Sequence, residues 1–208
     1  MLSRHAKSFA TRLFNPVAGG LLRLGVTPDA VTWAGTLVTV TASLWFYPRG
    51  EFFLGSLVIA CFVIFDTLDG TMARLSGRSS RWGAFLDSTL DRVADAALFA
   101  GLLLWFTGEG DDPVLAGVTL VVLIGGGVVS YTKARAEGLG LTCNVGIAER
   151  AERIILVLVT TGLAGLLDWP WLQAVGLWVL AALTVVTIGQ RMVEVRRQAT
   201  VEPPVPGA

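Results

Sequence analysis

Four aspartates are the residues of this sequence whose type and spacing could do chemistry. Asp66 and Asp69 are three residues apart, and Asp87 and Asp91 are four apart, so each pair shares one face of a helix. Carboxylate oxygens suit hard divalent cations. Two helices that each offer two carboxylates can hold a pair of Mg²⁺ ions about 3.5–4 Å apart, the arrangement that clamps both oxygens of a phosphoryl displacement. The alternative is that these are ordinary acidic residues solvated at helix ends.

The aspartates lie inside or beside segments that are apolar enough for a membrane. The 208 residues are 53% hydrophobic and 15% charged, which is too apolar for an ordinary soluble domain. A carboxylate at bilayer depth costs about 2.5–3.5 kcal/mol on insertion scales, so the aspartates require cations, partners or a water-filled cavity. The composition predicts one integral membrane domain with a polar site, and no nucleic-acid partner is expected.

Six apolar runs predict an all-α fold with six transmembrane helices, because each run is near the roughly 20 residues that a span requires. The runs cover approximately residues 27–47, 52–72, 84–106, 113–135, 149–167 and 170–193. Thr27, followed by Pro28 and Asp29, is typical of a helix start.

A segment of a different kind precedes the first run. Basic and apolar side chains alternate between residues 2 and 24, which predicts an amphipathic helix on the membrane surface, broken near Pro16 and Gly19–Gly20. The predicted division is therefore a surface helix at residues 1–26, a six-helix domain at 27–198 and a disordered tail at 199–208.

The distribution of Lys and Arg predicts the orientation in the membrane. Fifteen of the sixteen basic residues fall on one side of the six predicted helices, and Arg49 alone falls on the other. This excess is the positive-inside pattern. We therefore expect a multi-pass protein of the cell membrane whose termini and aspartates face the cytoplasm.

Three basic residues form a second group at the cytoplasmic level of the aspartates. Lys133 ends the fourth predicted helix, Arg153 begins the fifth, and Arg191 lies in the last turns of the sixth. Three cations beside a metal site suit a dianionic phosphate, whereas an uncharged alcohol gives them nothing to bind. The alternative is that they are membrane anchors, although Arg191 lies deeper than an anchor requires.

The stretch from Asp66 to Asp91, DTLDGTMARLSGRSSRWGAFLDSTLD, resembles the complete signature of the CDP-alcohol phosphotransferases. The matching positions are Asp66, Asp69, Gly70, Ala73, Arg74, Gly83, Asp87 and Asp91. The resemblance implies that Asp66 and Asp87 bridge two Mg²⁺ ions, for which Mn²⁺ is a substitute. It also implies that Asp69 completes one site and Asp91 the other, with Asp91 as the general base for the acceptor hydroxyl.

The same resemblance implies a site for CDP-diacylglycerol at the cytoplasmic side of the bundle. The expected residues are Asp29, Thr32, Gly70, Ala73, Arg74, Ser80 and Gly83. Gly70 and Gly83 allow a nucleotide or a neighbouring helix to approach the backbone closely. Arg74 can bind a phosphate with its planar fork, and its alternative role is an anchor at a helix end.

Two further sequences, YTKARAEGLG and GIAERAER, resemble the actinobacterial phosphatidylinositol phosphate synthases within this family. The resemblance implies transfer of the phosphatidyl group of CDP-diacylglycerol to inositol phosphate, with release of CMP, by a homodimer. The rival acceptor is glycerol 3-phosphate, which gives phosphatidylglycerophosphate, and the basic group does not separate the two.

A divalent-cation transporter is the alternative of a different class. It predicts carboxylates near mid-membrane on an unbroken path, whereas here Arg74, Arg78 and Arg81 lie between the two aspartate pairs. A structural scaffold has no use for four costly carboxylates. An enzyme is therefore the favoured reading.

Asp95 continues the face of Asp87 and Asp91 but lies outside the family signature. One turn deeper in the membrane, its carboxylate is costly unless it is paired. We expect it to pair with a basic residue of a neighbouring helix or with acceptor hydroxyls, in a supporting role and not as a metal ligand.

Overall fold

The computed structural model describes residues 15–75 and 80–200, without the side chains of residues 64–70 and 74. Every regular element in these ranges is a helix, as the sequence predicts, and a long α-helix coincides with each apolar run. The elements are α2 (Pro28–Phe46), η1 (Tyr47–Arg49, a 3₁₀ helix), α3 (Phe52–Leu75), α4 (Arg81–Thr107), α5 (Pro113–Gly138), α6 (Arg150–Leu167) and α7 (Pro170–Ala199).

Side-chain caps explain where two of the helices begin. Thr27 Oγ1 accepts a hydrogen bond from the N–H of Ala30 at 3.2 Å, which confirms the helix start predicted there. Ser80 Oγ accepts one from the N–H of Gly83 at 2.9 Å. These bonds satisfy backbone donors that the first turn of a helix leaves without a partner.

Helix α7 is longer than its apolar run, which ends at about residue 193, because it continues to Ala199. Arg197 donates two hydrogen bonds to Glu194, at 3.1 and 2.9 Å, and Gln198 donates another to Glu194 at 2.6 Å. Such pairs three and four residues apart support a helix without apolar packing. The predicted tail at 199–208 is therefore helical at Ala199, and residues 201–208 lie outside the described part of the chain.

The predicted break at Gly19–Gly20 is wrong, because residues 15–23 form one helical stretch. Ala18 is completely buried and packs with Met72 of α3, and Leu21 and Leu22 cover this contact. Packing against α3 thus offsets the roughly 1 kcal/mol that a helical glycine costs. Residues 1–14 of the predicted surface helix lie outside the described residues.

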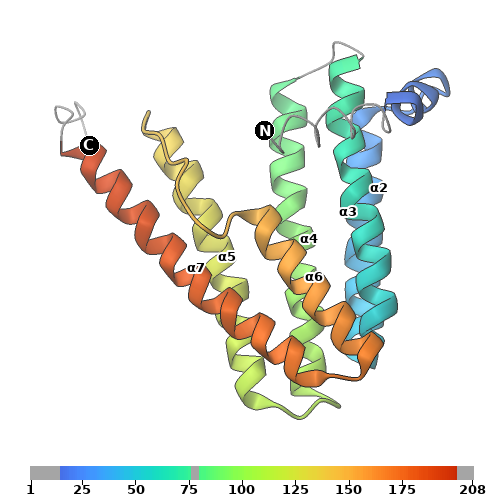
Figure 1. The fold of residues 1–208 in the computed structure, drawn as a ribbon. Coiled ribbons are helices and arrows are strands. Elements are labelled where there is room, and N and C mark those ends of the chain that lie inside the picture. Colours follow the sequence, from blue (N-terminus) through green and yellow to red (C-terminus); the bar gives the residue numbers. More distant parts are fainter. Residues whose placement is uncertain (1–14, 76–79, 201–208) are drawn as a thin grey trace, which may run out of the picture.

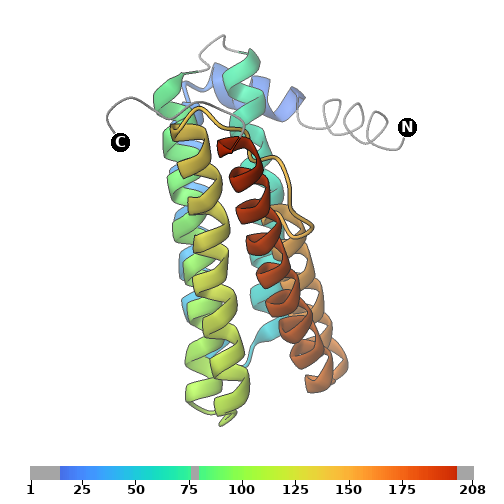
Figure 2. The same cartoon turned by 90° about the vertical axis from the view of Figure 1, so that its left-hand side faces the viewer.

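The long helices form one bundle (Figure 1). Helices α2, α3 and α4 form one group, α5 pairs with α7, and α6 packs against α3 and α7. The two views show that the connections 47–51, 108–112 and 168–169 lie at one end of the bundle (Figures 1 and 2). The start of α4, the end of α5 and the end of α7 lie at the other end, which holds most of the basic residues in the described part of the chain.

The connection between α5 and α6, residues 139–149, descends from that basic end into the bundle (Figure 1). Helix α6 therefore begins beside the middle of α4 and not beside its first turn. Arg150, the first residue of α6, consequently reaches Asp91 and Asp95, which lie in the second and third turns after Gly83 on α4.

Two of the described helices, α5 and α7, are long and apolar enough to cross a membrane, and Phe52–Val63 is a shorter apolar segment. Large apolar side chains also point outward from the bundle. Exposed examples are Leu37, Trp45, Leu57, Leu104, Ile124, Ile155, Leu166, Trp178 and Val185. An outer surface of this kind fits a lipid environment better than water.

A pair of alanine substitutions tests the close packing of α5 on α7. A Cβ at Gly125 would lie 2.5 Å from Cγ2 of buried Thr184, whereas a Cβ at Gly127 would meet nothing within 4 Å. We expect Gly125→Ala to cost about 1–3 kcal/mol and to lower the Tm in detergent by several degrees. Gly127→Ala should leave the Tm unchanged or raise it.

Thr184→Ser supplies the control, because it removes only the methyl group that the new Cβ would meet. Combined with Gly125→Ala, it should restore most of the Tm. Equal Tm values for the two glycine variants would contradict this packing.

Candidate active site

A cavity of about 300 Å³ lies between α4, α5, α6 and α7. It brings together all three members of the predicted basic group, Lys133, Arg153 and Arg191. The other lining residues are Ser88, Arg92, Val129, Ser130, Ala134, Glu137, Glu149 and Arg150. We call this space the acceptor cavity.

Arg191 is held in the wall of the acceptor cavity by backbone carbonyls. The residue is 3% exposed, Nε donates to the carbonyl of Val145 at 2.9 Å, and Nη1 donates to the carbonyl of Val129. Nη2 lies 3.7 Å from a carboxylate oxygen of Glu149. A membrane anchor would extend its guanidinium into water, so this fixed and buried position argues against an anchor role.

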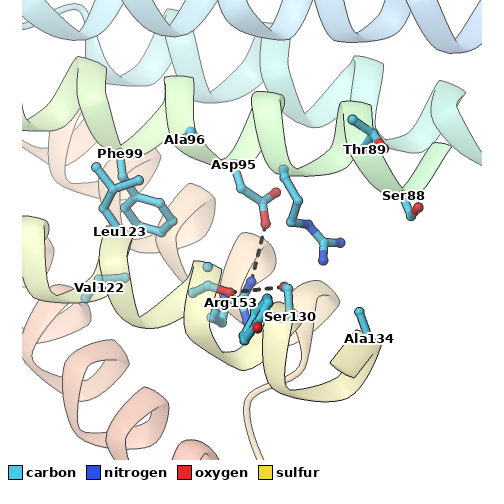
Figure 3. A pocket seen from close by; sticks show the side chains of 14 residues that line it. Ser88, Thr89, Asp95, Ala96, Phe99, Val122, Leu123, Ser130, Ala134 and Arg153 are labelled. Atoms are coloured by element: carbon cyan, nitrogen blue, oxygen red, sulfur yellow. Dashed lines mark hydrogen bonds and ion pairs between the residues drawn. The ribbon is translucent and has the colours of Figure 1, made fainter. Parts of the chain in front are cut away.

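Arg153 is still more buried, with 1% of the residue exposed. Its Nη2 donates to Oδ2 of Asp95 at 3.3 Å, and its Nη1 donates to the carbonyl of Ala148 at 3.5 Å. Figure 3 shows Arg153 reaching from its helix toward Asp95, with Ser130 of α5 beside it. The expectation that Asp95 pairs with a basic residue of a neighbouring helix is confirmed.

Arg150 is a residue of this site that the sequence analysis missed. Its Nη1 lies 2.9 Å from Oδ1 of Asp91, and its Nε donates to Oδ1 of Asp95 at 3.0 Å. It therefore joins a predicted metal ligand to the acceptor cavity. Its spacing of three residues from Arg153 was the available signal, because residues three apart share a helix face.

Lys133 and Arg92 complete the cationic lining. Lys133 is partly exposed, and its Nζ lies 4.0 Å from Glu137, so its position is the least constrained of the predicted group. The sequence predicts for Arg92 only that it is one of the fifteen basic residues on the cytoplasmic side. Its Nη2 lies 3.5 Å from Asp91, and its Nε is buried without a hydrogen-bond partner among the described residues.

Three of the residues predicted to bind the CDP-linked lipid, Asp29, Ser80 and Gly83, lie together where α2 and α4 begin. A Cβ at Gly83 would lie 3.3 Å from Oγ of Ser80 and 3.9 Å from Oδ1 of Asp29, so the glycine keeps this corner open. Thr32 is buried on α2, and its hydroxyl donates to the carbonyl of Pro28 at 3.2 Å.

The remaining predicted lipid contacts are on α3. Ala73 is half-buried, and Gly70 and Arg74 lie outside the described side chains.

The predicted metal ligands are described in part. Asp87 and Asp91 share one face of α4, and the side chains of Asp66 and Asp69 on α3 lie outside the described part. Among the side chains that are described, no three Asp, Glu, His or Cys groups lie together in a way that could hold a metal ion. A small cavity at Asp91 is also lined by Val63, one turn before Asp66. Asp91 thus faces the middle of α3, and carboxylate oxygens are donors that fit Mg²⁺.

The chain is similar to known proteins in sequence and in fold. The family model for CDP-alcohol phosphatidyltransferases matches residues 25–189. The phosphatidylinositol phosphate synthase of Streptomyces avermitilis is 52% identical over 205 residues, which cover 96% of this chain and 84% of that protein. The phosphatidylinositol phosphate synthase of Mycobacterium marinum is 46% identical over 183 residues, which cover 87% of this chain and 78% of that protein.

Solved structures of one relative have the same fold. The Mycobacterium tuberculosis phosphatidylinositol phosphate synthase with CDP-DAG bound matches with a TM-score of 0.89 at 43% identity, covering 93% of this chain and 99% of that one. The same synthase in complex with manganese and citrate matches with a TM-score of 0.88 at 42% identity, covering 92% of this chain and 93% of that one.

Proposed function

The chain belongs to the CDP-alcohol phosphatidyltransferase family, and we propose that it transfers the phosphatidyl group of CDP-diacylglycerol to inositol phosphate, giving phosphatidylinositol phosphate and CMP. The acceptor cavity is the observation that carries the choice of acceptor. It lies beside Asp91, because Arg150 both lines the cavity and forms an ion pair with Asp91.

The charge of the acceptor cavity supports a phosphorylated alcohol. Five of its lining residues are cationic, Arg92, Lys133, Arg150, Arg153 and Arg191, against the carboxylates of Glu137 and Glu149. A phosphate dianion can accept charge-assisted hydrogen bonds from such groups, whereas free inositol or serine leaves them without a counter-charge. We assign the acceptor's phosphate to Lys133, Arg153 and Arg191.

The four aspartates would hold the divalent ions, with Asp66 and Asp87 shared between two sites, Asp69 in one site and Asp91 in the other. Bound Mg²⁺, or Mn²⁺ in its place, neutralises the pyrophosphate and the charge that develops on the departing CMP. The relative whose structure contains manganese supports a divalent ion of this kind.

The protein residues orient the two substrates around the phosphorus on the lipid side of the pyrophosphate. Asp91 accepts the proton of the attacking acceptor hydroxyl, while the basic group fixes the other end of the acceptor. The CDP-lipid lies against Asp29, Thr32, Ser80 and Gly83, together with Gly70, Ala73 and Arg74 at the end of α3. The relative with bound CDP-DAG supports this donor.

The membrane arrangement is part of the same proposal. The six long helices cross the cell membrane, with the acceptor cavity and both termini at the cytoplasmic side and the surface helix at residues 1–26 along the membrane. The outward-facing apolar side chains and the location of the basic residues at one end support this topology. The functional unit is a homodimer, as in the family that the sequence resembles.

Release of CMP from CDP-diacylglycerol by the purified protein tests the function. We expect release to require both a divalent ion and an acceptor, to stop with EDTA and to resume with Mg²⁺ or Mn²⁺. Inositol phosphate, glycerol 3-phosphate and free inositol are supplied in parallel, and inositol phosphate should give the highest kcat/KM. Activity only with glycerol 3-phosphate would overturn the acceptor, and metal transport without CMP release would overturn the enzyme.

A further inference from the structure

Asp95 connects two arginines of α6 to α4. Its side chain is buried, with 8% of the residue exposed. Oδ1 accepts a hydrogen bond from Nε of Arg150 at 3.0 Å, and Oδ2 accepts one from Nη2 of Arg153 at 3.3 Å. Figure 3 shows the second bond joining α4 to Arg153. One carboxylate thus uses each of its oxygens to hold a different guanidinium.

Arg150 continues this contact to Asp91, one turn earlier on α4, where its Nη1 lies 2.9 Å from Oδ1. Arg150 and Arg153 are three residues apart in the first turn of α6, and Asp91 and Asp95 are four apart on α4. The two pairs therefore face each other, and the long arginine side chains join the start of α6 to α4. Because Arg150 contacts both carboxylates, the position of Asp95 and that of Asp91 depend on each other.

Arg153 depends on Asp95 for its orientation. A guanidinium removed from water requires a counter-charge, and the Nε of Arg153 has no hydrogen-bond partner among the described residues. On its other side the guanidinium lies against α5, since a Cβ at Gly126 would be 3.5 Å from Nη2. Asp95 on α4 and the backbone of α5 therefore hold Arg153 between them, in the wall of the acceptor cavity.

We propose that Asp95 is a positioning residue for the transfer. Asp95 holds Arg153, which binds the acceptor's phosphate. It also holds Arg150, and through Arg150 it positions Asp91, which receives the proton of the acceptor hydroxyl. Because Asp95 already orders the long side chains of Arg150 and Arg153, substrate binding does not carry the entropy cost of ordering them. Asp95 does not touch the substrate in this role. The inference rests on the proposed function, because it takes the acceptor's phosphate as the ligand of Arg153.

A double-mutant cycle between Asp95→Asn and Arg153→Gln tests this role in the purified full-length protein. Asparagine keeps the shape of the side chain, but an NH₂ group replaces one carboxylate oxygen, and this group cannot accept a hydrogen bond from a guanidinium. For Asp95→Asn alone, we expect the KM for inositol phosphate to rise on the order of tenfold, while the KM for CDP-diacylglycerol changes less than about twofold. In the Arg153→Gln background, Asp95→Asn should raise the KM for inositol phosphate by less than about twofold more.

Independent effects in the cycle, or equal increases in both KM values, would overturn the proposal. Asp95→Glu is the second variant, because it keeps the charge but, one methylene longer, cannot hold both arginines in the same positions. A folded Asp95→Glu protein with the wild-type acceptor KM would also overturn it. Glu194→Gln is the matched control, since it removes a carboxylate that pairs with the exposed Arg197, and both of its KM values should equal those of the wild type.

The cycle separates this inference from the proposed function. If the wild type uses glycerol 3-phosphate instead of inositol phosphate, the acceptor assignment fails, and the same cycle is read with glycerol 3-phosphate. Strong coupling between Asp95 and Arg153 would then support the positioning role, and its absence would refute it. If the wild type uses neither phosphorylated acceptor, both proposals fail.

Discussion

Replacing Asp87 by asparagine is expected to abolish turnover while the fold stays intact. In the proposed site Asp87 and Asp66 each contact both ions, so the loss of either carboxylate weakens both metal positions at once. Changes in the outer shell of a metal site cost up to about 100-fold, and the loss of a shared ligand should exceed this figure. The measurement is the rate of CMP release at saturating Mg²⁺ for Asp87→Asn and for Asp66→Asn.

Asp111→Asn is the matched control for these variants. Asp111 lies in the 108–112 connection at the opposite end of the bundle and has a φ of 42°, a conformation that asparagine tolerates well. It should retain wild-type activity and Tm. Substantial activity of Asp87→Asn or Asp66→Asn at saturating Mg²⁺ would contradict the two-metal assignment.

Loss of a single arginine from the acceptor cavity is expected to weaken binding of inositol phosphate and not binding of CDP-diacylglycerol. A charge-assisted hydrogen bond contributes about 1.5–3 kcal/mol, so Arg153→Ala and Arg191→Ala should raise the KM for inositol phosphate about tenfold or more. The KM for CDP-diacylglycerol should be nearly unchanged. Lys133→Ala should act in the same direction, and less strongly because Lys133 is the least constrained member of the group.

Arg197→Ala is the control for Arg191, because it removes an arginine from the exposed end of the same helix. It should leave both KM values unchanged. Arg74→Ala should show the opposite pattern, with a raised KM for CDP-diacylglycerol and an unchanged acceptor KM. An unchanged acceptor KM in all three cavity variants, measured on folded protein, would remove the phosphate site.

The helices and the basic group were predictable from the sequence because they follow from local patterns. Each apolar run corresponds to a helix, and Thr27 caps the helix predicted to begin there. Alternation of the helices placed Lys133, Arg153 and Arg191 at one end, and the structure brings them to one cavity.

The roles of Arg150 and Arg92 were not predictable in the same way. A single arginine at the cytoplasmic end of a helix has the same pattern whether it anchors the chain or lines a site. What distinguishes Arg150 is the descent of residues 139–149 into the bundle, which places it opposite Asp91 and Asp95. Residues 139–149 have no periodic pattern of apolar residues, so their path could not be predicted from the sequence.

The helical stretch at residues 15–23 shows the same limit. Glycine propensity predicted a break at Gly19–Gly20, but burial of Ala18 against Met72 overrides it. The extension of α7 to Ala199 likewise depends on the pairs of Glu194 with Arg197 and Gln198, which hydropathy does not register.

A competition assay tests the central claim most directly. The purified protein receives CDP-diacylglycerol, Mg²⁺ and equal concentrations of inositol phosphate, glycerol 3-phosphate and free inositol, and mass spectrometry identifies the lipid products. The proposed function predicts phosphatidylinositol phosphate as the dominant product, in an amount equal to the CMP released. Dominant phosphatidylglycerophosphate or phosphatidylinositol, or CMP release without a new lipid, would contradict it.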